Sequence, residues 1–345
     1  MKSPRGRAIR RKILIGGLVP LLLALAGFVA LAWGNTYDLR EERVTIPNGA
    51  APSLDGVLAL PATGRGPYGL VVFVHGDGPV DATHDGFYRP MWEAFAQAGY
   101  ASLSWNKPGV AGAAGDWLAQ SMADRAREVE TALTWAGSRP EIDERRTGLW
   151  GASQAGWVLP EVAARRPELR FVIAVSPTVN WLRQGRHNLL AELRAQGASP
   201  TRIRAAVDRS DRTRALLGAG ATFQEYRAAI GDSEDMTAAR WGFVLRNHRA
   251  DATRALAVAR VPTLLLLAGH DLNVDVAETE AAYRRAPAPL RVVHFPDADH
   301  AMLRREFAEP GLWTTLTALF APRDLFPDGY LSGQAAFVRD RAGQG

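Results

Sequence analysis

The chain has 345 residues, of which 47% are hydrophobic and 22% charged, and it contains no cysteine. Such a composition belongs to a chain that folds around a hydrophobic core, and the lack of cysteine excludes disulfides, thiol nucleophiles and thiolate metal sites. The net charge is +5, but six of the 41 basic residues precede residue 13. The remaining 35 basic and 36 acidic residues leave no positive excess for binding nucleic acid, so we expect no nucleic-acid partner.

The N-terminal 33 residues predict an anchored or exported protein. Residues 1–12 form a basic arm, and residues 13–33 carry no charge over 21 positions. A helix of that length spans roughly 30 Å, the thickness of the hydrocarbon layer of a membrane. The positive-inside rule then leaves the arm in the cytoplasm and the rest of the chain on the extracytoplasmic, periplasmic side. A cleaved signal peptide stays open as the alternative, because Ala30-Leu31-Ala32 has the form of a cleavage site and cleavage would make the protein secreted.

From about residue 40 the sequence alternates between short apolar runs and helical patterns. Two runs predict an opening antiparallel hairpin, and six later ones are largely continuous apolar stretches, as expected for strands that are covered on both faces. The runs are 43–46, 56–60, 70–74, 101–105, 147–150, 171–175, 263–267 and 291–295. Strand and helix alternation predicts an α/β fold with a mostly parallel eight-stranded sheet and helices on both faces.

Residues 178–260 contain no convincing strand and predict a helical cap inserted into a core made of residues 40–177 and 261–345. Ser199-Pro200 has the pattern that begins a helix. An insertion of this length is expected over the C-terminal edge of the sheet, where ligands bind. The large aromatic residues of the cap belong either to a substrate-facing surface or to its own core; they are Trp181, Trp241 and Phe243. The segment from Pro322 onward is too apolar to be a solvated tail.

A candidate nucleophile follows the strand at 147–150, in the run Gly151-Ala152-Ser153-Gln154-Ala155. A serine in a sharp strand-to-helix turn holds its hydroxyl above the sheet, and the helix that follows points backbone N–H groups toward it. A simple helix-capping serine would give the same letters, but the position after a buried strand favours a nucleophile. The backbone N–H of Gln154 is then a candidate donor to an oxyanion.

A second motif, His75-Gly76-Asp77-Gly78, follows the strand at 70–74. Read alone it is an ordinary glycine-rich turn. With a nucleophilic serine downstream, it predicts a loop whose backbone N–H near Asp77 faces the developing oxyanion, with the other three residues as supporting loop.

A nucleophilic serine needs a base and an acid that orients the base. His300 lies in the loop directly after the strand at 291–295, and Asp271 follows the strand at 263–267. Asp275, four positions later, is the rival acid. We favour Asp271, because the apolar Val274 returns the chain to the core three residues after it.

The order Ser153, Asp271, His300, each just after a successive strand, resembles the α/β-hydrolase superfamily, in particular its bacterial esterases and dienelactone-hydrolase-like members. The resemblance implies that the protein hydrolyses a carboxylic ester or related acyl bond of a small-molecule substrate through an acyl-enzyme, with no metal and no organic cofactor. A serine peptidase, a thioesterase and a membrane-tethered binding protein without activity are the alternatives. Two departures are Ala155, where glycine is common, and Asn106-Lys107-Pro108-Gly109, where relatives often have Asp-x-Arg-Gly.

Overall fold

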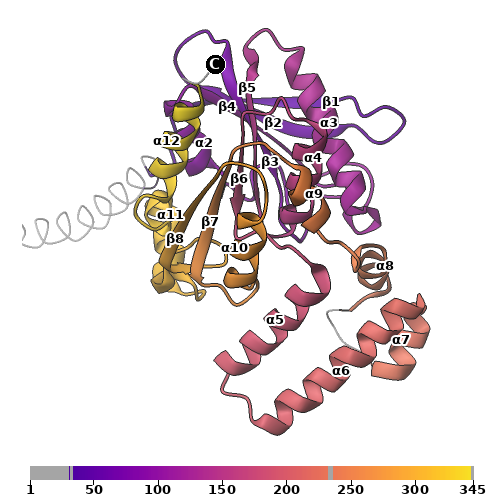
Figure 1. Ribbon diagram of the computed structural model, residues 1–345. Helices are drawn as coiled ribbons and strands as arrows, with labels where there is room; N and C mark the ends of the chain where they lie inside the picture. Colours follow the sequence, from indigo (N-terminus) through magenta and orange to yellow (C-terminus); the bar gives the residue numbers. More distant parts are fainter. Residues whose placement is uncertain (1–30, 32–33, 232–235, 343–345) are drawn as a thin grey trace, which may run out of the picture.

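The computed structural model describes residue 31 and residues 34–231 and 236–342, and these ranges hold one eight-stranded sheet with helices on both faces (Figure 1). The segment predicted to cross a membrane, residues 13–33, lies outside the described residues except for Leu31. Within the described ranges, no helix combines the length and the apolar character needed to cross a bilayer.

The sheet has the order β1-β2-β4-β3-β5-β6-β7-β8. β1 pairs antiparallel with β2 and β2 with β4, whereas all other neighbours are parallel. The strands are β1 (Leu39–Ile46), β2 (Leu54–Pro61), β3 (Tyr68–Val74), β4 (Tyr100–Trp105), β5 (Ile142–Ala152), β6 (Phe171–Val175), β7 (Thr263–His270) and β8 (Leu290–Asp299). The predicted fold class is therefore confirmed, including the opening hairpin.

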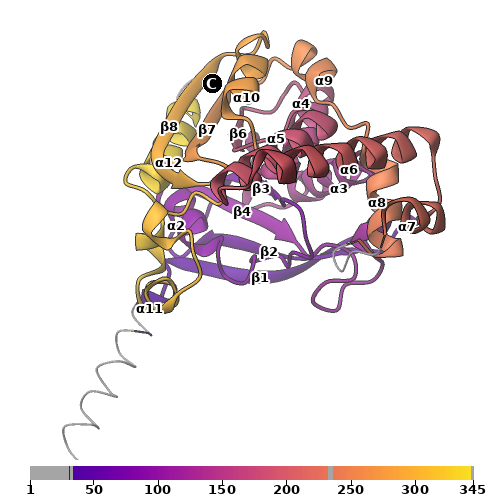
Figure 2. The same cartoon turned by 90° about the horizontal axis from the view of Figure 1, so that it is seen from below.

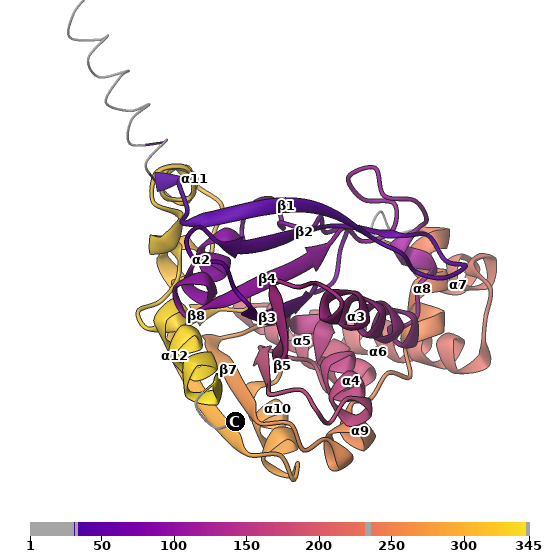
Figure 3. The same cartoon turned by 90° about the horizontal axis from the view of Figure 1, so that it is seen from above.

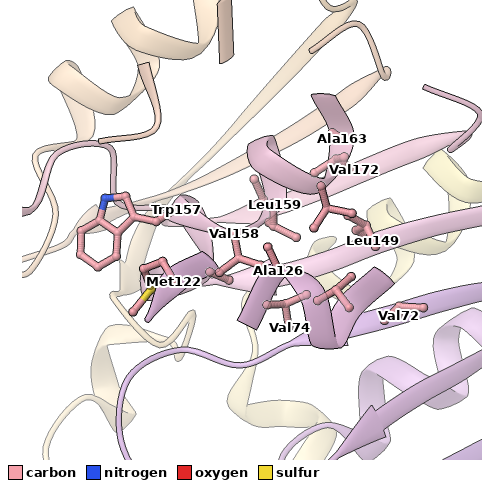
Figure 4. Packing of buried hydrophobic residues seen from close by; sticks show 14 of the residues in the cluster. Val72, Val74, Met122, Ala126, Leu149, Trp157, Val158, Leu159, Ala163 and Val172 are labelled. Atoms are coloured by element: carbon pink, nitrogen blue, oxygen red, sulfur yellow. The ribbon is translucent and has the colours of Figure 1, made fainter. Parts of the chain in front are cut away.

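The central strands are buried on both faces, which explains their continuous apolar sequences. In β3, Leu70, Val72 and Val74 point into one hydrophobic cluster, and Val71 and Phe73 point into another on the opposite face. This alternation follows from the two-residue period of a strand. The first cluster is covered by α3 (Met122–Gly137), α4 (Leu159–Arg165) and α10 (Val276–Arg284), as Figure 4 shows for α3 and α4, and the second by α2 (Arg89–Gln97) and α12 (Tyr330–Ala342).

The C-terminal segment belongs to the core, as its apolar composition predicts. Helix α12 is fixed to the sheet by two long-range hydrogen bonds: Trp150 Nε1 donates to Gln334 Oε1 at 2.7 Å, and Tyr100 Oη donates to the Val338 carbonyl at 2.9 Å. The preceding helix α11 (Leu312–Phe320) differs, because none of its residues is buried.

Five helices lie in the described part of the sequence between β6 and β7. They are α5 (Trp181–Ala195), α6 (Pro200–Ala219), α7 (Phe223–Ile230), α8 (Ala238–Asn247) and α9 (Thr253–Val258). The Ser199 hydroxyl accepts from the Arg202 N–H and caps α6 at the predicted position. Trp241 and Phe243 are buried, Trp241 stacks on Tyr226, and Trp181 stacks on Trp157 of the core. The aromatic residues thus pack among these helices and at their contact with the sheet domain. Figure 2 shows the molecule from the side on which α5, α6, α7 and α8 lie.

Candidate active site

Ser153 stands at the junction of β5 and a 3-10 turn, η2 (Ser153–Trp157), with a backbone φ of +54°. A non-glycine residue rarely adopts this conformation, and strain of this kind gathers at functional turns. Small neighbours make the turn possible: a Cβ on Gly151 would lie 2.7 Å from the Cβ of Ala155, and one on Gly156 would lie 2.3 Å from the Thr178 carbonyl oxygen. Ala155 is fully buried, so alanine fits where glycine is common.

The helix after the turn is less regular than the sequence suggests. The helix expected to follow the turn is interrupted, because η2 ends at Trp157 and α4 begins only at Leu159. The reason is Pro160, which has no N–H to donate to the Gly156 carbonyl and therefore interrupts a continuous α-helical ladder.

Three residues distant in sequence form one hydrogen-bonded chain. His300 Nε2 lies 2.9 Å from Ser153 Oγ, and His300 Nδ1 lies 2.8 and 2.9 Å from the two Asp271 oxygens. The side chain of Asp271 has no exposed surface, and its Oδ1 also accepts from the backbone N–H groups of Asn273 and Val274, at 2.9 and 2.8 Å. Because an ionised carboxylate only accepts, Nδ1 carries the imidazole proton, and Nε2 is left to accept from the serine hydroxyl.

The pairing of β7 with β8 explains why the acid and the histidine meet. A register shift after Ala268 pairs His270 with Asp299, so the next residue of each strand, Asp271 and His300, leaves the sheet edge side by side. The prediction that β8 ends near residue 295 was wrong, because the strand continues to Asp299 through this irregularity. At the shift, a Cβ on Gly269 would lie only 2.3 Å from the Pro296 carbonyl oxygen.

Asp275, the rival acid, has another function in the structure. Its Oδ1 accepts from the Glu278 N–H at 3.0 Å and caps α10. Asp271 is therefore the aspartate that contacts His300.

His75 anchors the loop that follows β3. Its Nε2 donates to the Trp105 carbonyl at 2.5 Å, so its Nδ1 must accept from the Tyr88 hydroxyl at 3.0 Å. Burial lowers the pKa of His75 well below the usual range, and the nearby Lys107 lowers it further. His75 is thus neutral, and its two hydrogen bonds fix it to β4 and to Tyr88.

The loop backbone lies against Ser153. A Cβ on Gly76 would lie 3.6 Å from the Ser153 Cβ, and Gly78 has a φ of +91° that favours glycine. The Asp77 carboxylate accepts from Gln154 Nε2 at 2.9 Å. The two residues predicted to supply backbone donors are therefore in direct contact through their side chains.

Two buried basic residues that the sequence analysis did not assign support this loop. Lys107, which is 3% exposed, donates from Nζ to the Gly76 carbonyl at 2.6 Å and to the Gly78 carbonyl at 2.8 Å. Arg125 of α3 donates to the His75 carbonyl at 2.5 Å and to Gln154 Oε1 at 2.6 Å. Burial, together with the charge of Arg125, lowers the pKa of Lys107 to about 6.

The sequence does contain a signal for each of these two basic residues. Lys107 is the single lysine after residue 12, in a chain that otherwise uses arginine. Arg125 lies three residues after Met122 and four before Val129, on the apolar stripe of α3, where a solvated charge is not expected.

The cap reaches the same loop through Arg240 of α8. Its guanidinium makes two hydrogen bonds to the Asp77 carboxylate, at 3.1 and 2.5 Å, and lies over the rings of Phe243 and Trp117. Burial raises the pKa of Asp77, but the hydrogen bond and the charge of Arg240, together with smaller contributions from the Gly78 N–H and from Lys107, outweigh burial, and the net pKa is lowered. Asp77 is therefore ionised at neutral pH and joins cap and core.

Among the described residues, no cluster of three or more His, Asp or Glu side chains is arranged to hold a metal.

The family model described as serine aminopeptidase, S33, matches residues 65–306, a range that contains every residue of this site. The chain belongs to this family of α/β hydrolases. The S33-family chain is thus an enzyme of the hydrolase class. No curated protein matches its sequence.

Solved structures resemble the fold of this hydrolase. An esterase from Pyrococcus furiosus is 14% identical with a TM-score of 0.55, over 89% of this chain and 91% of that one. Est1E from Butyrivibrio proteoclasticus, solved with ferulic acid bound, is 14% identical with a TM-score of 0.55, over 87% and 98%. A 2,6-dihydroxy-pseudo-oxynicotine hydrolase is 16% identical with a TM-score of 0.55, over 88% and 68%. At these identities the likeness is one of fold.

Proposed function

We propose that the protein cleaves a carboxylic ester, with Ser153 as nucleophile, His300 as base and Asp271 as the acid that orients it. The observation that carries the proposal is the unbroken hydrogen-bonded chain Ser153 Oγ–His300 Nε2 at 2.9 Å and His300 Nδ1–Asp271 at 2.8 Å. It begins at a serine in a strained turn and ends at a fully buried carboxylate, which is the arrangement that activates a hydroxyl.

The reaction has two half-cycles. His300 Nε2 takes the hydroxyl proton as Ser153 Oγ attacks the acyl carbon, while Asp271 stabilises the imidazolium. The tetrahedral oxyanion collapses to an acyl-enzyme, and His300 gives its proton to the leaving alcohol. Water, deprotonated by the same imidazole, then attacks the acyl-enzyme and regenerates the serine.

The backbone N–H groups of Gln154 and Asp77 are proposed to stabilise the oxyanion, each contributing about 3–4 kcal/mol by analogy with measured oxyanion donors. Lys107 supports this assignment for Asp77. It holds the Gly76 carbonyl, and in a planar trans peptide the N–H of the next residue points the opposite way. The direction of the Asp77 N–H is thus fixed before substrate binds.

An aminopeptidase is the second candidate, because the family description names that activity. Such an enzyme must bind a free α-ammonium group with a carboxylate. The carboxylate of Asp77, next to the nucleophile, already accepts hydrogen bonds from Arg240 and Gln154. The Arg125 guanidinium in turn donates to the side chain of Gln154. These charges favour a neutral or anionic acyl group over a peptide N-terminus.

Labelling with a fluorophosphonate tests the nucleophile. Wild-type protein should be labelled, and Ser153→Ala should not. Ser176→Ala is the matched control, because Ser176 also follows a buried strand with a positive φ, of +39°. Failure of folded wild-type protein to react would favour a binding protein without activity.

Substrate class is then measured with p-nitrophenyl esters of increasing chain length, acyl thioesters and aminoacyl anilides. Ester turnover should exceed the others. Anilide turnover equal to or above that of the esters would reassign the enzyme as a peptidase, and faster thioester turnover would reassign it as a thioesterase.

We also propose that residues 13–33 tether the hydrolase to a membrane with its catalytic part on the extracytoplasmic side. The support is the sequence pattern of a basic arm followed by 21 uncharged residues. The mass of the mature protein and its flotation with membranes test this. A mature chain that begins after Ala32 would replace the tether with secretion.

A further inference from the structure

Helix α11 presents large apolar side chains to its surroundings. Leu312 is 70% exposed, Trp313 75%, Leu319 46% and Phe320 36%. At 3.6 residues per turn, these four lie within an arc of about 120° on the helix surface. The sequence from Pro310 to Pro322 contains no charged residue. An exposed apolar patch of this kind on a hydrolase marks a surface of interaction.

The N-terminal end of the main described range lies against this helix. Asn35 Nδ2 donates to the Leu319 carbonyl at 2.5 Å, and a Cβ on Gly34 would lie 2.0 Å from the Phe320 carbonyl oxygen. Figure 3 shows α11 at the corner of the molecule where this part of the chain enters β1. Gly34 and Asn35 therefore lie directly beside the exposed patch.

Arg323, just after α11, holds the segment before β1 against this helix. It donates to the Gly34 and Thr36 carbonyls, both at 2.8 Å, and pairs with both carboxylate oxygens of Glu93 at 2.7 and 2.9 Å. Its guanidinium also lies 4.4 Å from the ring centre of Tyr37. These five interactions of one side chain fix the position of residues 34–37 relative to α11.

We propose that α11 lies in the interface of a lipid bilayer and orients the hydrolase on it. The proposal rests on the tether proposed above: a segment that leaves the bilayer at residue 33 brings α11 to the lipid surface. An uncharged helix with one apolar arc can bury that arc at the level of the lipid head groups, and an exposed tryptophan favours the boundary between head groups and acyl chains. The exposed Trp313 is then the anchoring side chain.

The cysteine-free chain permits a direct test with single reporter cysteines. The full-length protein with Leu312→Cys, labelled with an environment-sensitive fluorophore, is reconstituted in phosphatidylcholine vesicles. Val258→Cys on α9 is the matched control, an apolar side chain 60% exposed on another part of the molecule. Leu319→Cys serves as a second reporter on α11. Retained ester hydrolysis confirms that each variant is folded.

Quenching by lipids with nitroxide groups on their acyl chains should be at least threefold greater at residues 312 and 319 than at residue 258, with blue-shifted emission only on α11. Equal quenching at the three positions in protein that floats with the vesicles would overturn the proposal and leave the tether intact. Protein that does not float would overturn both.

Two further outcomes also contradict a lipid-facing α11. In the first, the reporter is shielded from water but is not quenched by the lipids, and two unlabelled Leu312→Cys chains form a disulfide cross-link that depends on protein concentration. This result would assign the patch to a second copy of the chain. Shielding that depends on neither lipid nor concentration would assign it to the N-terminal segment of the same chain.

Discussion

The two sides of Ser153 are built in different ways. On one side, His300 and Asp271 each follow the last residue of a strand, and the register of β7 and β8 brings them together. On the other side, the loop at residues 75–78 takes its shape from two buried basic side chains, Lys107 just after β4 and Arg125 in α3. The proposed proton-transfer groups come from strand ends, whereas the proposed oxyanion loop depends on a polar network in the core.

The largest effect is expected on the strand-end side. Asp271→Asn should lower kcat by about 10⁴-fold. An amide favours the wrong imidazole tautomer, and it cannot stabilise the imidazolium that forms during the reaction. Steady-state ester hydrolysis measures it.

Asp275→Asn is the matched control for that variant. It changes a helix cap that contacts Glu278, so it should cost at most about 1 kcal/mol of stability and leave kcat within twofold. A large loss of activity in Asp275→Asn with little in Asp271→Asn would reverse the assignment of the acid.

This side of the site is also the one that the sequence predicts well. Ser153, Asp271 and His300 follow strands that are recognisable as apolar runs, and parallel strands deliver their C-terminal ends to one edge. What escaped prediction is the β7–β8 irregularity at Gly269, because it depends on a close approach to Pro296 that a linear pattern does not encode. The interruption at Pro160 is local and was available from the sequence.

The loop side could not be predicted to the same degree. Lys107 and Arg125 act through contacts with carbonyls 29 to 50 positions away. The sequence marks both residues as unusual, but it does not say which carbonyls they contact. Likewise, the sequence of α8 gives no indication that Arg240 reaches Asp77, 163 positions earlier. Such contacts depend on how whole helices and strands pack together, which the hydrophobic periodicity of the sequence does not specify.

The second prediction tests whether the buried lysine positions the loop. Lys107→Met keeps the chain length but releases the Gly76 and Gly78 carbonyls, so the Asp77 N–H loses its fixed direction. We expect kcat to fall about 10²-fold with little change in KM, as for loss of an oxyanion donor.

Two measurements separate positioning from simple unfolding in Lys107→Met. Circular dichroism should show a folded protein, and fluorophosphonate labelling of Ser153 should slow in proportion to kcat. An unchanged kcat in the folded variant would remove Lys107 from the positioning function.

A smaller effect is expected where the cap meets the loop. The Arg240–Asp77 pair is partly exposed, and such pairs contribute little on their own. Arg240→Met should therefore lower kcat/KM only about fivefold, with partial recovery in Arg240→Lys. Arg246→Met, on the same helix, is the control and should be silent. Loss of activity equal to that of Lys107→Met would mean that the cap, and not the core, fixes the loop.

The last effect concerns the pH dependence of stability, not activity, and it tests the loop side alone. Burial lowers the pKa of Lys107 from 10.5 to about 6. Between these values the unfolded chain binds a proton that the folded chain does not, so the free energy of unfolding should rise with pH across that window, by at most about 1.4 kcal/mol per pH unit. Below pH 6 both states are protonated and the contribution of Lys107 to the slope vanishes.

Urea denaturation of wild-type protein and Lys107→Met from pH 7 to pH 9 measures this contribution as the difference between two slopes. Methionine has no proton to lose, so its slope should be the smaller. A neutral amine has two N–H bonds, which matches the two carbonyls that Lys107 holds, whereas an ammonium would retain a third, unused donor. Equal slopes would show that the lysine stays charged in the fold, and the loop would then be held by an ammonium ion whose charge also stabilises the oxyanion.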